Sequence, residues 1–228
     1  MKIKTLVGAV LGVIATLTTG LAGATVYNAT SDFSLTNNPT GVWSYGWMPA
    51  DFSSFNLYPD TRIETAALGG STVWYDTALG TEPNLWRNDT LNTYFNVLPG
   101  QLAMHPGGNG QAAVLRFTAP SAGTAAVDWE FFAGDFGSPT VGVRDGSAFL
   151  WSASNSGASS LTTVFTPGST LDFLIYGGYF GGNTPLAASV NFTTSGTTGG
   201  NNGIPEPATM ALMGLGLAGL AFRKRKTG

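Results

Sequence analysis

Two carboxylates separated by one residue, Asp128 and Glu130, are the first residues whose spacing suggests chemistry. On a β-strand they share one face, roughly 6.6–7 Å apart, a spacing that touches the range for the acid and base of an inverting glycosidase. Their alternation with Val127, Trp129 and Phe131 is equally typical of the solvated face of a half-buried strand. Spacing alone is a weak criterion, so we predict no catalytic role for this pair.

His105 is the only histidine, and it precedes Pro106-Gly107-Gly108, so we expect it in a turn at the end of a strand. There are no cysteines, which excludes disulfides, thiolate metal sites and cysteine nucleophiles. Acidic residues and carbonyls in the loops of a β-sandwich suit a structural Ca²⁺, and Asp135, Asp145 and Asp172 are available for one. No D-x-D-x-D loop is present, so we predict no cofactor and assign no metal ligand.

Four tryptophans in the first half of the chain are the candidate sugar-binding residues: Trp43, Trp47, Trp74 and Trp86. An exposed aromatic face stacks on sugar C–H groups, whereas the usual fate of a tryptophan is burial in a core. Trp43 and Trp47 alternate with Tyr45 and share one strand face, which favours the core. Trp86 is the best candidate, because its neighbours from 84 to 89 are mostly polar and predict an exposed loop.

The charged residues divide the chain into a body and two ends. All four lysines lie in the first four or the last five residues. Between Thr25 and Ile204 there are four arginines and twelve acidic residues, a net charge of −8. A basic face for nucleic acid is therefore not expected. Only 10% of the residues are charged, and 32 are glycine, which favours an all-β extracellular protein.

Residues 1–24 have the pattern of a signal peptide. Lys2 and Lys4 form a positive start, residues 6–17 are an apolar run, and Ala22-Gly23-Ala24 fits a cleavage site before Thr25. An N-terminal transmembrane anchor is the alternative. It is less favoured, because the apolar run is short and ends in threonines and a glycine.

The other end combines a short apolar segment with a basic cluster. Residues 208–222 are uncharged, but a membrane-spanning helix needs about 20 residues, so this one is marginal. The following Arg223, Lys224, Arg225 and Lys226 form a basic stop that would stay on the cytoplasmic side. Residues 214–219 also match G-x-G-x-x-G, but the preceding prolines exclude the strand that a nucleotide site requires.

The last segment, residues 204–228, resembles the PEP-CTERM sorting domain of exported bacterial proteins. The residues that carry the resemblance are Pro205, Glu206 and Pro207, the apolar stretch and the basic end. The resemblance implies that an exosortase-type membrane protease recognises the Pro-Glu-Pro triplet and removes or exchanges the tail. It also implies export through an inner-membrane intermediate to the cell surface or matrix of bacteria that make exopolysaccharide.

The body, residues 25–194, has the alternation and turn spacing of an antiparallel β-sandwich. Strand candidates cover residues 111–119, 125–132, 141–144, 148–152, 161–166, 170–176 and 186–194. In the more irregular and aromatic first half, the candidates are residues 42–47, 72–75 and 93–97. Residues 195–203 contain no apolar side chain and are predicted to be a flexible linker. The segments 31–47 and 105–131 also resemble bodies seen among PEP-CTERM proteins, which implies a jelly-roll sandwich of the carbohydrate-binding type.

We therefore predict a β-sandwich flanked by an N-terminal signal helix and a C-terminal transmembrane sorting helix. Its expected function is that of a non-enzymatic surface or extracellular-matrix protein that contacts exopolysaccharide or other glycans. Two alternatives remain open: a polysaccharide hydrolase or lyase, and a self-associating matrix protein that binds no sugar.

Overall fold

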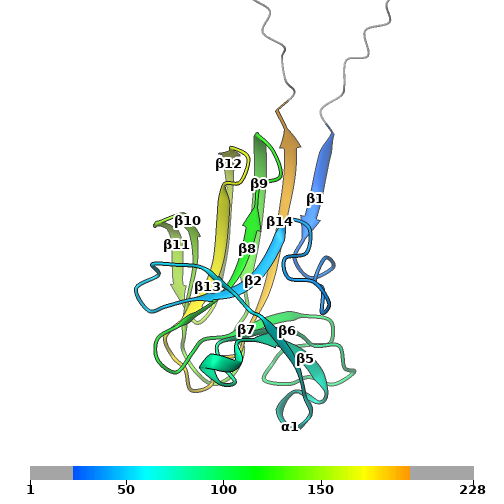
Figure 1. Cartoon of the computed structure of the whole chain (residues 1–228), viewed down its shortest axis with the longest axis vertical. Coiled ribbons are helices and arrows are strands. Elements are labelled where there is room, and N and C mark those ends of the chain that lie inside the picture. Colours follow the sequence, from blue (N-terminus) through cyan, green and yellow to red (C-terminus); the bar gives the residue numbers. More distant parts are fainter. Residues whose placement is uncertain (1–22, 196–228) are drawn as a thin grey trace, which may run out of the picture. The chain divides into compact units, whose positions relative to one another are not determined.

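The computed structural model describes residues 23–195, which form a sandwich of two antiparallel β-sheets (Figure 1). The predicted all-β antiparallel sandwich is confirmed. The predicted signal peptide, linker and sorting helix lie outside the described residues, apart from Gly23, Ala24 and Ser195. Within residues 23–195, no helix has the length and apolar character needed to span a membrane.

The larger sheet has eight strands in the order β12-β9-β14-β7-β6-β5-β4, and β1 also pairs with β14. Its strands are β1 (Ala24–Asn28), β4 (Asp60–Glu64), β5 (Ser71–Tyr75), β6 (Asn84–Arg87), β7 (Leu102–His105), β9 (Gly123–Phe131), β12 (Gly157–Phe165) and β14 (Thr184–Thr194). β14 joins two halves of the sheet. Residues 184–186 pair with β7, and residues 189–193 pair with β1. The long strands β12, β9 and β14, together with β1, therefore lie beside the short strands β7 to β4 (Figure 1).

The smaller sheet has six strands in the order β11-β10-β13-β8-β2-β3. Its strands are β2 (Trp43–Met48), β3 (Asn56–Leu57), β8 (Ala112–Thr118), β10 (Thr140–Asp145), β11 (Ala148–Ser154) and β13 (Thr170–Tyr176). β10 and β11 form the hairpin that Asp145-Gly146 predicts, with Gly146 at a φ of 54°. A short helix, α1 (Thr65–Leu68), joins β4 to β5, and a 3-10 turn, η1 (Thr77–Leu79), follows β5.

Side chains that alternate along the strands meet between the two sheets. In β9, Val127, Trp129 and Phe131 are buried, whereas Asp128 and Glu130 are exposed, as predicted. Burial of large aromatic side chains supplies the dominant favourable contribution to folding. The core aromatics contributed by both sheets include Trp43, Tyr45, Trp74, Phe117, Phe131, Phe173 and Phe192.

The outer face of the six-stranded sheet is covered by the segment between β2 and β3. Arg116 donates two hydrogen bonds to Asp172, at 2.6 and 2.9 Å, and Asp172 is buried. The ring of Phe55 lies 4.0 Å from the Arg116 guanidinium, and Phe52 packs in the same way on Arg144. These cation–π contacts and the ion pair close this face of the sandwich.

A second cover lies on the outer face of β5, β6 and β7. Leu68 of α1 and Val97 of the segment between β6 and β7 pack on Trp86, Val73 and Ala103. The expected strand at residues 93–97 is wrong. These residues form a turn in which the φ angles of Phe95 and Asn96 are 50° and 61°, a left-handed conformation that a strand does not allow.

Candidate functional site

A polar cavity of about 200 Å³ lies beside this cover, on the outer face of the short strands. We call it the His105 cavity. Arg62 of β4, Asn84 of β6 and His105 of β7 face it. Asn84 and His105 are direct partners in the register of β6 and β7, so the sheet places them side by side. Loops add further polar side chains, those of Glu82, Asp135 and Asn183.

Asn84 contributes a buried oxygen that has no hydrogen-bond partner among the described residues. Its amide nitrogen donates to the carbonyl of Thr81 at 3.1 Å, which leaves Oδ1 unpaired. The residue is only 4% exposed. An unpaired acceptor at this depth costs about 1–3 kcal/mol, and Asn84 lines the cavity, so a donor bound there would be favourable.

His105 is the last residue of β7 rather than part of the turn that follows. Its Nδ1 lies 2.8 Å from the carbonyl oxygen of Pro106. Because a carbonyl can only accept, Nδ1 carries the proton and Nε2 is an acceptor. Burial lowers the pKa of His105 below its usual 6.5, although the charges of Glu82 and Asp135 act in the opposite direction. The imidazole is therefore neutral at neutral pH.

Two carboxylates give the His105 cavity a negative potential. Glu82 accepts a hydrogen bond from the Thr81 hydroxyl, and Asp135 accepts one from the Phe136 amide at 2.8 Å. Neither takes part in any of the three ion pairs found in residues 23–195. The charge of Glu82 also raises the pKa of the Tyr179 hydroxyl, which lies 3.5 Å from it.

The one guanidinium group in the cavity is already occupied. Arg62 Nε lies 3.4 Å from Glu64 Oε2, close enough for an ion pair but without hydrogen-bond geometry. The same guanidinium lies 4.7 Å from the centre of the Tyr75 ring. The positive charge of Arg62 therefore balances Glu64, and the charges of Glu82 and Asp135 remain uncompensated within the described part of the chain.

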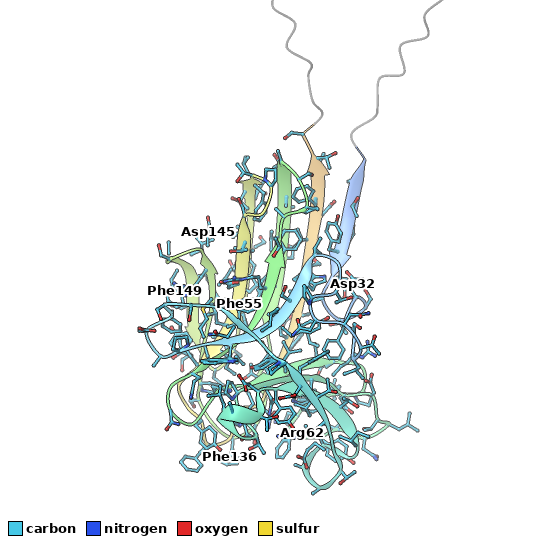
Figure 2. The ribbon with its side chains drawn as sticks, in the orientation of Figure 1. Asp32, Phe55, Arg62, Phe136, Asp145 and Phe149 are labelled. Carbon is cyan, nitrogen blue, oxygen red and sulfur yellow. The ribbon has the colours of Figure 1, made fainter. Side chains whose placement is uncertain are left out.

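A second hollow, of about 440 Å³, shares Glu82 with the His105 cavity and carries aromatic rings. Tyr179 and Phe180 line it, and Phe180 is 81% exposed. Phe136, 84% exposed, stands on the neighbouring loop and points away from the ribbon (Figure 2). Two backbone hydrogen bonds, from Gly137 N to Gly181 O and from Asp135 N to Asn183 O, join the two loops. Polar groups and exposed rings thus lie at the same end of the sandwich.

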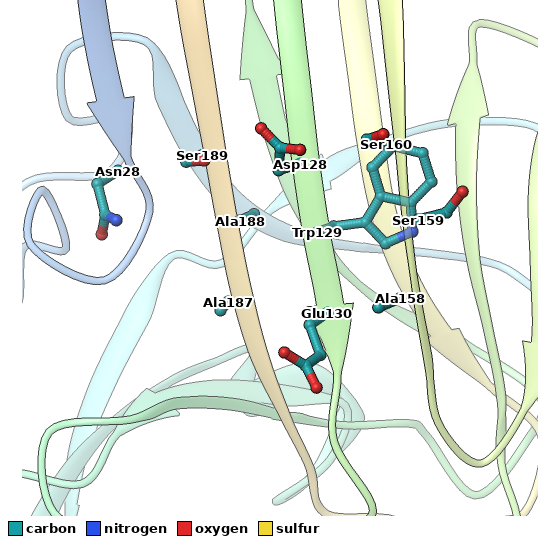
Figure 3. Close-up of a pocket in the computed structure, with 10 residues that line it drawn as sticks. All are labelled: Asn28, Asp128, Trp129, Glu130, Ala158, Ser159, Ser160, Ala187, Ala188 and Ser189. Carbon is teal, nitrogen blue, oxygen red and sulfur yellow. The ribbon is translucent and has the colours of Figure 1, made fainter.

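The predicted carboxylate pair lies elsewhere on the same sheet. Asp128 and Glu130 stand on the outer face of β9, in an open hollow of about 560 Å³ (Figure 3). Ser160 and Ser189 flank Asp128 in the register of the sheet, and alanines flank Glu130. No side chain of the described residues donates a hydrogen bond to either carboxylate. The face is exposed as predicted, and among the described residues the hollow is lined only by β1, β9, β12 and β14.

The tryptophans that were candidates for sugar stacking are buried or half-buried. Trp86 is 0% exposed and lies in β6, so the expectation of an exposed loop at this position is wrong. The reason is tertiary, because the cover formed by Leu68 and Val97 closes over the ring. Its indole nitrogen donates to Asn183 at 3.2 Å and so ties the core of this half to the cavity. Trp43 and Trp74 are also buried, and Trp47 is half-buried.

The exposed rings were missed because they lie outside any periodic pattern. Phe136 and Phe180 are flanked by glycines, in Asp135-Phe136-Gly137 and Tyr179-Phe180-Gly181-Gly182. A large aromatic residue in a glycine-rich loop cannot be held in a core by regular structure. That local signal could have identified both residues.

The residues considered for Ca²⁺ are separated by the fold. Asp172 is taken by Arg116, Asp145 is exposed at the end of β10, and Asp135 lies at the His105 cavity. Within residues 23–195, no three His, Asp or Glu side chains are grouped so that they could hold a metal ion.

Comparison with known proteins identifies the C-terminus. Residues 203–226 match the family model of the PEP-CTERM protein-sorting motif, so the chain carries this motif. The match includes Pro205, Glu206, Pro207 and the basic cluster at residues 223–226. No curated protein matches the chain.

Among solved structures, the sandwich is similar to carbohydrate-binding modules. One is the CBM35 from Paenibacillus barcinonensis, with 11% identity over 75% of this chain and 99% of that chain, at a TM-score of 0.28. Another is the family 35 module from Clostridium thermocellum, with 11% identity over 64% of this chain and 97% of that chain, at a TM-score of 0.28. A third is the C-terminal CBM6 of a laminarinase from Zobellia galactanivorans, with 14% identity over 65% of this chain and 99% of that chain, at a TM-score of 0.28. At these TM-scores the likeness identifies no ligand.

Proposed function

We propose that this chain is an exported, non-enzymatic glycan-binding protein of the cell surface or extracellular matrix. The sorting motif at residues 203–226 supports export and processing by an exosortase-type protease. The observation that supports glycan binding is the His105 cavity, which joins uncompensated acceptors to exposed aromatic rings. A sugar presents hydroxyl groups, which can donate to the acceptors, and apolar C–H faces, which can pack on the rings.

The size of the His105 cavity fits the binding of one sugar unit. Ligand sites for drug-sized molecules have volumes of about 300–1,000 Å³, so a cavity of about 200 Å³ suits one sugar unit. A hydrolase has to hold a unit on each side of the bond that it cleaves, and the second hollow has room for a neighbouring unit. Because Glu82 and Asp135 also face the His105 cavity from two different loops, a polysaccharide hydrolase stays the enzymatic alternative.

Binding and turnover can be measured together on the purified protein. We expect it to bind at least one member of a panel of bacterial polysaccharides without releasing reducing ends. Phe180→Ala removes an exposed ring from the second hollow and is expected to weaken that binding. Leu91→Ala, which removes another exposed side chain that lines neither hollow, serves as the control. Failure to bind any glycan would overturn the proposal, and so would release of reducing ends that is lost in Glu82→Gln.

Sorting is tested by the mass of the protein recovered from its producing cells. We expect the C-terminus to have been cut near Pro205-Glu206-Pro207. Recovery of the intact tail ending in RKRKTG as the only form would contradict processing.

One observation supports self-association as a second candidate function. No charged residue occurs from Ala148 to Leu171, a segment that contains the edge strands β11 and β12. Val164 of β12 is 75% exposed. An uncharged, exposed edge strand can pair with another copy of itself, whereas the acidic faces of the body repel one another. Sedimentation of wild type, Val164→Lys and the control Leu91→Lys tests this, and assembly that survives Val164→Lys would exclude this edge.

A further inference from the structure

We propose that the His105 cavity binds the ammonium group of an amino sugar, so that the preferred ligand is a glycan with free rather than acetylated amino groups. This inference rests on the proposed function and narrows it to one class of ligand. It follows from the charge of the cavity, from its hydrogen-bonding groups and from its volume.

The charge of the cavity excludes an anionic sugar and favours a cationic one. Glu82 and Asp135 have no cationic partner within residues 23–195, and Arg62 is paired with Glu64. The imidazole of His105 is neutral at neutral pH, since burial lowers its pKa. Two uncompensated carboxylates would repel a uronic acid and attract an ammonium group.

The hydrogen-bonding groups of the cavity are mainly acceptors. The carboxylates of Glu82 and Asp135 are joined by the unpaired Oδ1 of Asn84, which is buried and therefore needs a donor. An ammonium group offers three donors and no acceptor, whereas a hydroxyl group offers one donor. Hydrogen bonds between an ammonium and a carboxylate are roughly twice as strong as neutral ones. The three acceptors come from a strand and two loops, and all three line the His105 cavity.

The two adjoining hollows accommodate a chain rather than a free monosaccharide. The His105 cavity, at about 200 Å³, has room for one sugar unit. The second hollow begins at Glu82 and presents Tyr179 and Phe180. A neighbouring sugar unit would place its C–H face on these rings, while its amino-bearing neighbour occupies the cavity.

The open hollow on the same sheet provides a matched comparison. Asp128 and Glu130 are also two carboxylates without a cationic partner in the described part of the chain. They face solvent between serines and alanines, and the buried unpaired atom of this hollow is a donor, Trp129 Nε1, rather than an acceptor like Asn84 Oδ1. Exposed charges are screened by water and salt, so this pair is not expected to select a ligand.

The experiment is a calorimetric titration with three oligosaccharides of equal length, made of glucosamine, N-acetylglucosamine or galacturonic acid. It is run at a pH at which the glucosamine amine is protonated. We expect glucosamine to bind tightest, by about tenfold over N-acetylglucosamine, and galacturonic acid to bind weakest. The double variant Glu82→Gln, Asp135→Asn is expected to lose this preference. The double variant Asp128→Asn, Glu130→Gln has the same change in net charge and is expected to keep it.

Each outcome decides between the two levels of the proposal. Equal or tighter binding of N-acetylglucosamine overturns the amino-sugar inference and leaves glycan binding intact. Equal loss of preference in both double variants also overturns it, because the effect would then come from net charge rather than from the cavity. If none of these sugars and no polysaccharide of the wider panel binds, the proposed function itself is wrong.

Discussion

The two halves of the eight-stranded sheet have the same strand alternation but very different outer faces. The open half, made of β12, β9, β14 and β1, presents mostly small and polar side chains to solvent, with Val26 and Val164 as exposed apolar exceptions. Figure 3 shows the part of this face around Asp128 and Glu130. The covered half, made of β7, β6, β5 and β4, carries Trp86 and Val73 beneath α1 and Val97. Among the sites described above, only the His105 cavity, beside the covered half, contains a buried oxygen without a hydrogen-bond partner, Asn84 Oδ1.

The lengths of the strands and of their connections explain this difference. β9, β12 and β14 have 9, 9 and 11 residues, whereas β6 and β7 have four residues each. The long segment between β6 and β7 folds back over the outer face of β5, β6 and β7, where Val97 packs on Trp86. Strand alternation alone therefore produces a solvated surface, and the connections turn part of that surface into a site.

Among the variants considered, Trp86→Ala should cause the largest difference in stability between the covered and the open half. Trp86→Ala removes a fully buried ring and the hydrogen bond to Asn183, so we expect a loss of about 3–5 kcal/mol in the free energy of unfolding. Val164→Ala on the open half should change it by no more than about 0.5 kcal/mol. Urea denaturation measures both values. Similar losses in the two variants would show that the halves do not differ in the way that we describe.

Removing the side chain that holds the cover should have the next largest effect. Asn88 is buried, and its amide donates to the carbonyls of Asn92 and Val97 at 2.8 and 2.9 Å. Asn88→Ala removes these two hydrogen bonds and the two that Asn88 Oδ1 accepts from Thr90, and is expected to cost about 2–3 kcal/mol. Hydrogen exchange should quicken in residues 88–100 before it does in β9. Asn191→Ala on the open half is the control, and uniform exchange in both variants would contradict a local role.

Replacing Asn84 separates ligand binding from stability. Asn84→Leu removes the unpaired oxygen, which should stabilise the fold. It also removes the hydrogen bond to Thr81, which should destabilise it. We expect the free energy of unfolding to change by about 1 kcal/mol or less in either direction. Affinity for the preferred glycan should fall by about tenfold. A fall in stability of several kcal/mol without a change in affinity would make Asn84 a structural residue only.

In the open half, β9 and β14 were predictable from the sequence because they are long and regular, whereas β1 and residues 157–160 of β12 were not predicted. The alternation of Val127, Trp129 and Phe131 with Asp128 and Glu130 placed β9 and its faces correctly. In the other sheet, the Asp145-Gly146 turn placed the hairpin of β10 and β11. In such strands the local pattern and the tertiary environment agree.

The covered half was not predictable in the same way. β6 has only four residues, and its polar neighbours gave a pattern typical of a loop. Trp86 is buried by the cover of Leu68 and Val97, which no local sequence pattern predicts. The cavity has the same difficulty. Glu82, Asp135 and Asn183 are separated by more than 100 residues in total, and pairing between distant loops brings them together. Only the glycine-flanked rings of Phe136 and Phe180 leave a local signal.

The pH dependence of stability gives the smallest expected effect and isolates the cavity from the rest of the sheet. Burial holds the pKa of His105 below 6.5, so the unfolded chain binds this proton more readily than the folded one. The stabilisation from a neutral His105 is therefore complete above the unfolded pKa of about 6.5 and is lost as the pH falls through that value.

Because the chain has no other histidine, a change between about pH 7 and pH 5.5 can be traced to this residue. We expect His105→Gln to flatten the profile of unfolding free energy over this window, whereas Asp128→Asn on the open half leaves it unchanged. The measurement is urea denaturation at a series of pH values. A wild-type profile that rises as the pH is lowered through this range would mean that Glu82 and Asp135 outweigh burial. In that case the imidazole would be cationic, and it would compete with the ammonium group for the same carboxylates.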